Sequence, residues 1–254
     1  MGNLKLERAY KAQAWNKKME EEHQKLIQSS ISKTIIYDEF DHLFYPISNN
    51  QSLVIEVVDL DTVSAIMQYQ DSSKMAALSF ASYKNPGGGF LKGSLTQEEA
   101  LCQKSFLYNV LNHFYQDYYV ENRQNLNYSL YKNRALYSPN IYFYFNDQIG
   151  LCDIITCSAP NFSAARKHPQ VDLQTNEEEL LSRIKFILDI ASTNKIETLI
   201  LGAFGCGVFG QNPTKVAEMM KNLLRQKYPF KKVIFAIPKS KHNKNYEAFK
   251  KVFE

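Results

Sequence analysis

Two short segments of this 254-residue sequence carry residue types that could perform chemistry together. Gly87-Gly88-Gly89 can bring bare backbone N–H groups close to a ligand, which suits phosphate oxygens. Gln97-Glu98-Glu99 follows after seven intervening residues and supplies a pair of carboxyl groups. A carboxylate beside a phosphate-binding loop is costly unless it serves chemistry, because like charges repel. Since a carboxyl group can protonate a leaving oxygen and then activate water, we expect hydrolysis of a glycosidic bond.

The two glutamates also have a purely structural interpretation. Thr96 and Glu99 have the spacing of a capping box, and acids in a first helical turn suit the helix dipole. Taken alone, a capped helix start is the better explanation of Glu98 and Glu99. The triple glycine nearby is what favours a catalytic role.

A second glycine-rich segment, Gly205-Cys206-Gly207-Val208-Phe209-Gly210, lies between a predicted strand and a predicted helix. It matches the G-x-G-x-x-G pattern of dinucleotide-dependent oxidoreductases. Against that function, no acidic residue stands on a strand about 20 residues onward, and little sequence remains for a second half-fold. We interpret the segment as a pyrophosphate cradle. A simple tight turn is the structural alternative, and the lone Cys206 is expected to pack as a small residue.

The composition is typical of a globular protein, and its mildly basic charge is compatible with an anionic ligand. Apolar residues make up 44% of the chain, and the net charge of +4 is too small to indicate a nucleic-acid groove. The charged N-terminus predicts no signal peptide, and no apolar run approaches the length of a membrane span. The four cysteines form no close pair, so we expect no metal site and a reducing, cytoplasmic location.

Apolar periodicity and capping residues predict strands that alternate with helices, which is typical of an α/β sheet covered on both faces. We expect a mixed, largely parallel sheet in a single domain over residues 1–254, with a helical extension over about residues 1–50. Strands are predicted at 53–58, 75–80, 140–145, 153–158, 198–202 and 233–237. Helices are predicted at 6–28, from 61, at 97–118, at 177–191, from 212 and at 245–253, with a loop at 120–138.

These motifs resemble the macrodomain-fold poly(ADP-ribose) glycohydrolases of the bacterial type. The resemblance rests on both glycine loops, on Gln97-Glu98-Glu99, and on Asn85-Pro86 and Ser158-Ala159-Pro160-Asn161, and it runs over nearly the whole chain. It implies a three-layer α/β/α macrodomain, with no cofactor and no metal. It also implies that the ligand is ADP-ribose or its polymer, with ADP-ribosylated proteins or nucleic acid as further partners. We expect no membrane partner, and we expect a monomer.

The resemblance also implies a role for each matching residue. Glu99 is the expected acid and base at the ribose–ribose bond, and Glu98 is expected to hold the adjoining ribose. Asn85 and Phe209 are expected to contact the distal ribose, and Asp61 to read the adenine amino group. The other predicted binding residues are Gly87, Gly88, Gly89, Gln97, Gly205, Cys206, Gly207, Val208 and Gly210. For the adenine contact Asp59 competes with Asp61, and either acid could simply cap a helix.

Three further functions remain open at this level. One is removal of mono-ADP-ribose from protein, nucleic acid or a small molecule, and another is a reader that binds ADP-ribose without cleaving it. An intact Glu98-Glu99 pair argues against the reader, since binding alone does not require it. The dinucleotide oxidoreductase ranks last.

Overall fold

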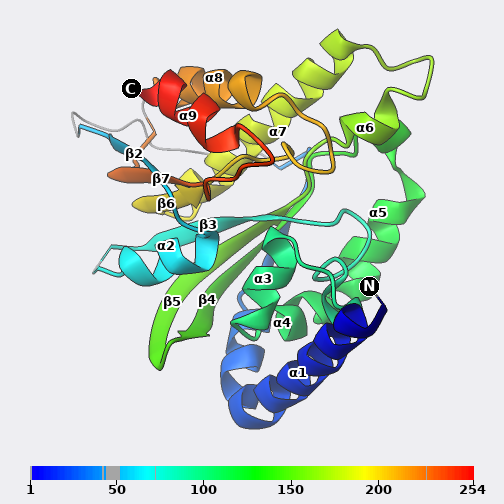
Figure 1. The fold of residues 1–254 in the computed structure, drawn as a ribbon, viewed down its shortest axis with the longest axis vertical. Helices are drawn as coiled ribbons and strands as arrows, with labels where there is room; N and C mark the ends of the chain where they lie inside the picture. Colours follow the sequence, from blue (N-terminus) through cyan, green and yellow to red (C-terminus); the bar gives the residue numbers. More distant parts are fainter. Residues whose placement is uncertain (1, 42, 44–51, 72, 227) are drawn as a thin grey trace.

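The computed structural model describes residues 2–41, 43, 52–71, 73–226 and 228–254, which form a seven-stranded sheet between helical layers (Figure 1). The strand order is β1-β4-β5-β3-β6-β7-β2. β4 pairs antiparallel with β1 and β5, and the remaining neighbours pair in parallel. The strands are β1 (Ile35–Tyr37), β2 (Val54–Val58), β3 (Met75–Phe80), β4 (Ala135–Phe145), β5 (Gln148–Cys157), β6 (Thr198–Leu201) and β7 (Lys232–Ala236). The predicted mixed, largely parallel α/β sheet is confirmed.

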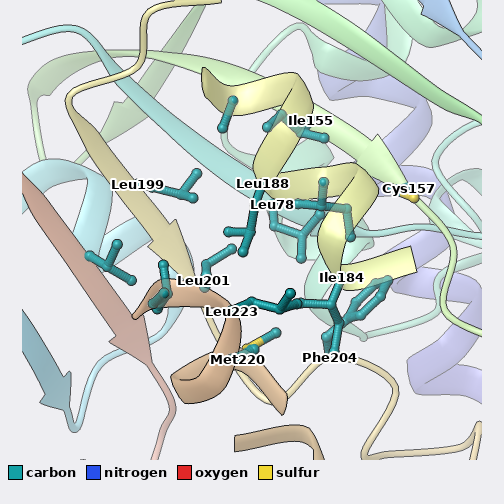
Figure 2. Packing of buried hydrophobic residues seen from close by; sticks show 14 of the residues in the cluster. Leu78, Ile155, Cys157, Ile184, Leu188, Leu199, Leu201, Phe204, Met220 and Leu223 are labelled. Atoms are coloured by element: carbon teal, nitrogen blue, oxygen red, sulfur yellow. The ribbon is translucent and has the colours of Figure 1, made fainter. Parts of the chain in front are cut away.

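The central strands are apolar on both faces because each face is covered. In β3, Ala76 and Leu78 join one core cluster, whereas Met75 and Ala77 join the other. Successive side chains of a strand point to opposite faces, so a doubly covered strand places apolar residues at successive positions, as Met75–Leu78 do. The part of the first cluster around Leu78 is drawn in Figure 2.

The helices divide between the two faces of the sheet (Figure 1). α7 (Leu173–Thr193), α8 (Pro213–Leu224) and α9 (Asn245–Phe253) contribute to the core cluster of one face. α1 (Gly2–Ile31), α2 (Thr62–Gln68), α3 (Gln97–Gln103) and α4 (Leu107–His113) contribute to the other. Shorter helices are α5 (Glu121–Gln124) and α6 (Phe162–Ala165). Among the described residues, no helix has the length and hydropathy needed to cross a bilayer.

The N-terminal helix α1 is packed against the segment that follows the triple glycine. Arg8 Nε donates to Gly93 O at 2.9 Å, and Trp15 Nε1 donates to Ser105 O at 2.9 Å. Gly93 has φ +73°, and a Cβ there would meet Lys5 O and lie 2.9 Å from Ala9 N. The backbones of α1 and of residue 93 therefore approach as closely as they do only because residue 93 has no side chain.

The single helix predicted at 97–118 is wrong, since the chain breaks after α3 and turns before α4. Ser105 forms an isolated bridge with Phe143, and Tyr144 N donates to Lys104 O at 2.7 Å. The carbonyls of Lys104 and Ser105 are thus bonded to β4 and α1 instead of to the next helical turn. After α4, residues Tyr115–Val120 form a π-helical turn.

The loop predicted at 120–138 is also wrong in part. It contains α5, a short 3-10 turn at Asn127–Ser129 and the first residues of β4. β4 begins at Ala135, earlier than predicted, and its register with β5 shifts between Ser138 and Ile141. An interruption at this point, which includes Pro139, divides the strand into two apolar runs.

The extension predicted over about residues 1–50 contains a strand as well as a helix. Its first 31 residues include α1, but β1 then pairs with β4 at the edge of the sheet. Residues 42 and 44–50 lie outside the described residues. The predicted helices from 61, from 212 and at 245–253 are confirmed, with Asp61 and Asn212 as N-caps.

Replacing Gly93 tests how tightly α1 is seated. We expect Gly93→Ala to lower the free energy of unfolding by about 1–3 kcal/mol, because the new methyl group overpacks against α1 in a left-handed backbone conformation. Gly207→Ala is the control, since no heavy atom lies within 4 Å of a Cβ at residue 207. Urea unfolding of both variants provides the measurement, and equal stability of the two would contradict this packing.

Candidate active site

A cavity of about 900 Å³ opens at the carboxyl ends of the parallel strands. Ala81–Asn85 follow β3, Ala203–Phe209 follow β6, and Ile237 and Pro238 follow β7; residues of all three segments line the cavity. The first turn of α3 and Asp61 at the start of α2 complete its walls. Ligands of open α/β sheets bind at this edge, so the cavity lies where the fold favours a ligand site.

Glu98 is held in the wall of the cavity with 2% of its surface exposed. Its Oε2 accepts from Ser82 N at 2.8 Å, whereas Oε1 is buried without a hydrogen-bond partner among the described residues. Burial raises the pKa of Glu98 well above its ordinary value, and the neighbouring charge of Glu99 adds to that shift. The Ser82 N–H lowers the same pKa in part.

Glu99 is 4% exposed, and both of its carboxyl oxygens accept hydrogen bonds from the segment that precedes it. Its Oε1 accepts from Gly89 N at 2.8 Å, and its Oε2 accepts from Thr96 N at 2.8 Å and from the Thr96 hydroxyl. The capping box expected from the sequence is therefore present. The same carboxylate also accepts a hydrogen bond from the triple glycine. Glu99 is therefore both part of the capping box of α3 and the acid beside the glycine loop.

Gly88 packs directly against both carboxyl groups, and all three residues line the cavity. It has φ +59°, and a Cβ there would lie 2.7 Å from Glu99 Oε1 and 2.8 Å from Glu98 Oε2. Any side chain at residue 88 would displace both acids. Gly88 and Gly89 line the cavity, whereas Gly87 does not. A Cβ at residue 87 would lie 2.8 Å from Tyr108 Cδ2.

Gln97 fixes the start of α3 to the sheet. Its Oε1 accepts from Phe80 N at 2.8 Å, and its Nε2 donates to Leu78 O at 2.8 Å and to Thr62 Oγ1 at 3.0 Å. Both amide atoms are thus engaged with β3 and α2. Gln97 also lines the cavity, but its contacts within the protein place it as a support for Glu98 and Glu99.

The second glycine segment forms another wall of the cavity. Gly205, Gly207, Val208 and Phe209 line the cavity, whereas Cys206 and Gly210 do not. The Cys206 side chain packs against the core, and burial raises its pKa to about 12. A thiol with such a pKa stays protonated, which agrees with the expected packing role and not with a nucleophile.

Asn85 lines the cavity at its mouth, and its side chain is oriented by α5. Arg123 Nη2 donates to Asn85 Oδ1 at 3.1 Å and also to Lys84 O. Asn122, which is buried, donates to Tyr83 O at 2.9 Å. The bond from Arg123 orients the Asn85 amide, whose nitrogen can donate to a ligand.

The two acids near α2 have different surroundings. Asp59 Oδ1 accepts from Lys239 N at 2.7 Å, and the residue does not line the cavity. Asp61 lines the cavity, but its carboxylate accepts from Ser64 N at 2.9 Å and from Ser64 Oγ at 3.0 Å as the N-cap of α2. Its adenine contact stays a prediction.

Several lining residues were not predicted from the sequence. Tyr131 stacks on Tyr83 with ring centroids 4.3 Å apart and meets Phe209 edge-on at 6.3 Å, so it joins the two glycine walls. It stands in a stretch without periodic apolar spacing, and nothing in that stretch indicated a site. The other unpredicted lining residues include Lys84, Lys92, Asn161, Pro238, Ser240 and Asn243. No cluster of three potential metal ligands occurs in the described part of the chain.

Comparisons with known proteins converge on one family. Residues 6–146 match the microbial-type PARG catalytic domain, where PARG denotes poly(ADP-ribose) glycohydrolase. The chain is similar to poly(ADP-ribose) glycohydrolase from Thermomonospora curvata, with 26% identity, a TM-score of 0.86, and coverage of 98% of this chain and 100% of that one. No curated protein sequence matches.

Two liganded structures are also similar to this chain. The T267K mutant of the Deinococcus radiodurans glycohydrolase, in complex with ADP-ribose, has 29% identity and a TM-score of 0.82, covering 90% of this chain and 97% of that one. The Thermomonospora curvata enzyme bound to the inhibitor ADP-HPD has 26% identity and a TM-score of 0.82, covering 96% and 98%.

We expect the contribution of the buried Glu98 to the free energy of unfolding to fall as pH rises. A carboxyl group whose pKa is raised in the folded state binds more protons there than in the unfolded state, so stability is lost above the ordinary pKa of 4.5. We expect Glu98→Gln to raise the melting temperature at pH 7, with a difference from wild type that shrinks toward pH 4.5. Differential scanning calorimetry across this range is the measurement. Glu218→Gln, at an exposed position, is the control; a Glu98→Gln effect that does not change with pH would contradict the assignment.

Proposed function

The chain belongs to the microbial-type poly(ADP-ribose) glycohydrolase family, and from this premise we propose which residues of the cavity bind the terminal ADP-ribose unit and which break the bond behind it. The protein is accordingly a glycoside hydrolase that acts on poly(ADP-ribose). The observation that carries the residue assignment is the placement of Glu98 and Glu99 against the triple glycine, in a cavity that the second glycine segment also lines.

We propose that backbone N–H groups of the loop around Gly205 and Gly207 bind the diphosphate of the terminal unit. A diphosphate held there would place the distal ribose between Phe209 and Asn85, which line the same cavity. The Asn85 amide nitrogen forms no hydrogen bond among the described residues, so it can donate to a ribose hydroxyl while Arg123 donates to the amide oxygen. Because the donors are backbone N–H groups, this wall needs no charged side chain to bind the diphosphate.

We propose that Glu99 is the general acid and base. In this reaction Glu99 gives its proton to the oxygen that joins the two riboses while the bond from the anomeric carbon to that oxygen breaks. Water then adds to the anomeric carbon and returns a proton to the Glu99 carboxylate. The products are ADP-ribose and a polymer that is one unit shorter and ends in a free ribose hydroxyl.

Glu98 is the competitor for the role of acid, because burial raises its pKa. We assign it instead to holding the adjoining ribose, since its Oε2 is fixed by Ser82 N and its Oε1 retains capacity for a further hydrogen bond. A neutral carboxyl can donate as well as accept, which suits a ribose hydroxyl.

A single copy of the chain supplies both glycine walls and both carboxyl groups, which supports a monomeric enzyme and a single catalytic domain over residues 1–254. The four cysteines are free, and three of them are buried, which supports a reducing location such as the cytoplasm. Proteins or nucleic acids that carry the polymer would present the same terminal unit to the cavity.

The Glu99 assignment is tested by Glu99→Gln. Glutamine also serves at this position of a capping box, so the fold is retained while the proton is lost. We expect the kcat for release of ADP-ribose from the polymer to fall by about 10²–10⁴-fold, with ADP-ribose binding kept. Chromatography of the released nucleotides and calorimetric binding of ADP-ribose are the measurements.

Glu98→Gln is the matched variant, and we expect it to act mainly through KM. A larger loss of kcat in Glu98→Gln than in Glu99→Gln would reverse the two roles. Binding of ADP-ribose without release by the wild type would mean that the chain is a reader.

A further inference from the structure

Two lysines flank the triple glycine in the wall of the cavity, and neither has a role in the proposed binding of the terminal unit. Lys84 precedes Asn85, and Lys92 follows the triple glycine; both line the cavity and are exposed. The wall formed by Gly205–Phe209 offers backbone donors for the diphosphate and has no basic side chain. The positive charge of the cavity therefore stands on the wall that holds the carboxyl groups, where the bond would be cut.

Neither lysine is neutralised within the described residues. No ion pair or side-chain hydrogen bond is formed there by Lys84 or Lys92, whereas Lys239, beside the far end of the cavity, pairs with Asp59 at 3.6 Å. Arg123 adds a third charge next to Lys84. It donates to Lys84 O and Asn85 Oδ1, lies over the Tyr115 ring at 5.1 Å and has no acidic partner in the described chain.

The position of the two lysines matters because the cavity also has acidic lining residues. They are Asp61, Glu98 and Glu99, and the two glutamates lie on the same wall as the lysines. A polyanion must approach these glutamates closely to be cleaved, and two unpaired lysines reduce the repulsion at that point. In poly(ADP-ribose) the unit beyond the scissile bond carries its own diphosphate, one ribose away from the leaving oxygen.

We propose that Lys84 and Lys92 form a subsite for the diphosphate of the leaving unit, so that the enzyme recognises two consecutive units of the polymer. The ligand is the diphosphate of a substrate that continues past the scissile bond. Free ADP-ribose, which ends at that bond, does not reach the subsite. The inference rests on the proposed function, because it takes the bond near Glu98 and Glu99 as the one that is cut.

The test compares polymer and product on the double variant Lys84→Glu/Lys92→Glu. We expect the KM for poly(ADP-ribose) to rise by about tenfold, and the dependence of KM on salt to become weaker, because two phosphate contacts are lost. The Kd for ADP-ribose should stay within about twofold of wild type, since exposed charges away from a ligand contribute little. The variant Lys84→Gln/Lys92→Gln should show a smaller increase in KM.

Lys33→Glu/Lys251→Glu is the matched control, with the same change in net charge at two exposed lysines that do not line the cavity. An equal rise in KM for this control would reduce the effect to net charge and overturn the subsite. Loss of ADP-ribose affinity in Lys84→Glu/Lys92→Glu would assign the lysines to the terminal unit and overturn it as well. An unchanged KM would do the same. Failure of the proposed function itself would appear separately, as a wild-type protein that releases no ADP-ribose.

Discussion

Glu98 and Glu99 are adjacent acids that are almost completely buried, and neither has a basic partner among the described residues. Burying a carboxylate is costly unless hydrogen bonds replace its water. Here the donors are the backbone N–H groups of Gly89 in the triple glycine, of Ser82 before it and of Thr96 after it. The loop is therefore built around the two acids, and residue 88 is a glycine because a side chain would occupy their place.

Other parts of the molecule hold this arrangement from outside. Gln97 bonds the start of α3 to β3 and α2, so the helix that carries both acids cannot shift along the sheet. On the far side, α1 bonds Gly93 and Ser105, immediately beyond the loop and beyond α3. The N-terminal helix is therefore part of the packing around both acids. Asn85 is oriented in a similar way by α5 through Arg123. Each support comes from an element distant in sequence, which fixes the acids relative to the second glycine wall.

Local chemistry predicted the parts of the fold that depend on neighbours in sequence. The capping box at Thr96, the N-cap at Asn212 and the apolar strands around Leu78 and Ile200 are such features. The break at Ser105 depends on Trp15 and β4, and the separation of Asp59 from the cavity depends on Lys239, 180 positions away. Lys84 and Lys92 read as ordinary surface lysines until the fold places them in the cavity. Such contacts leave no periodic trace in the sequence.

The central claim is that this cavity breaks a ribose–ribose bond while the diphosphate stays intact. The most direct measurement is degradation of poly(ADP-ribose) in water labelled with oxygen-18, with the products followed by mass spectrometry. We expect ADP-ribose that carries the label on its terminal ribose, as the hydroxyl at the anomeric carbon. Label in a phosphate group, together with products cut between the two phosphorus atoms, would contradict it.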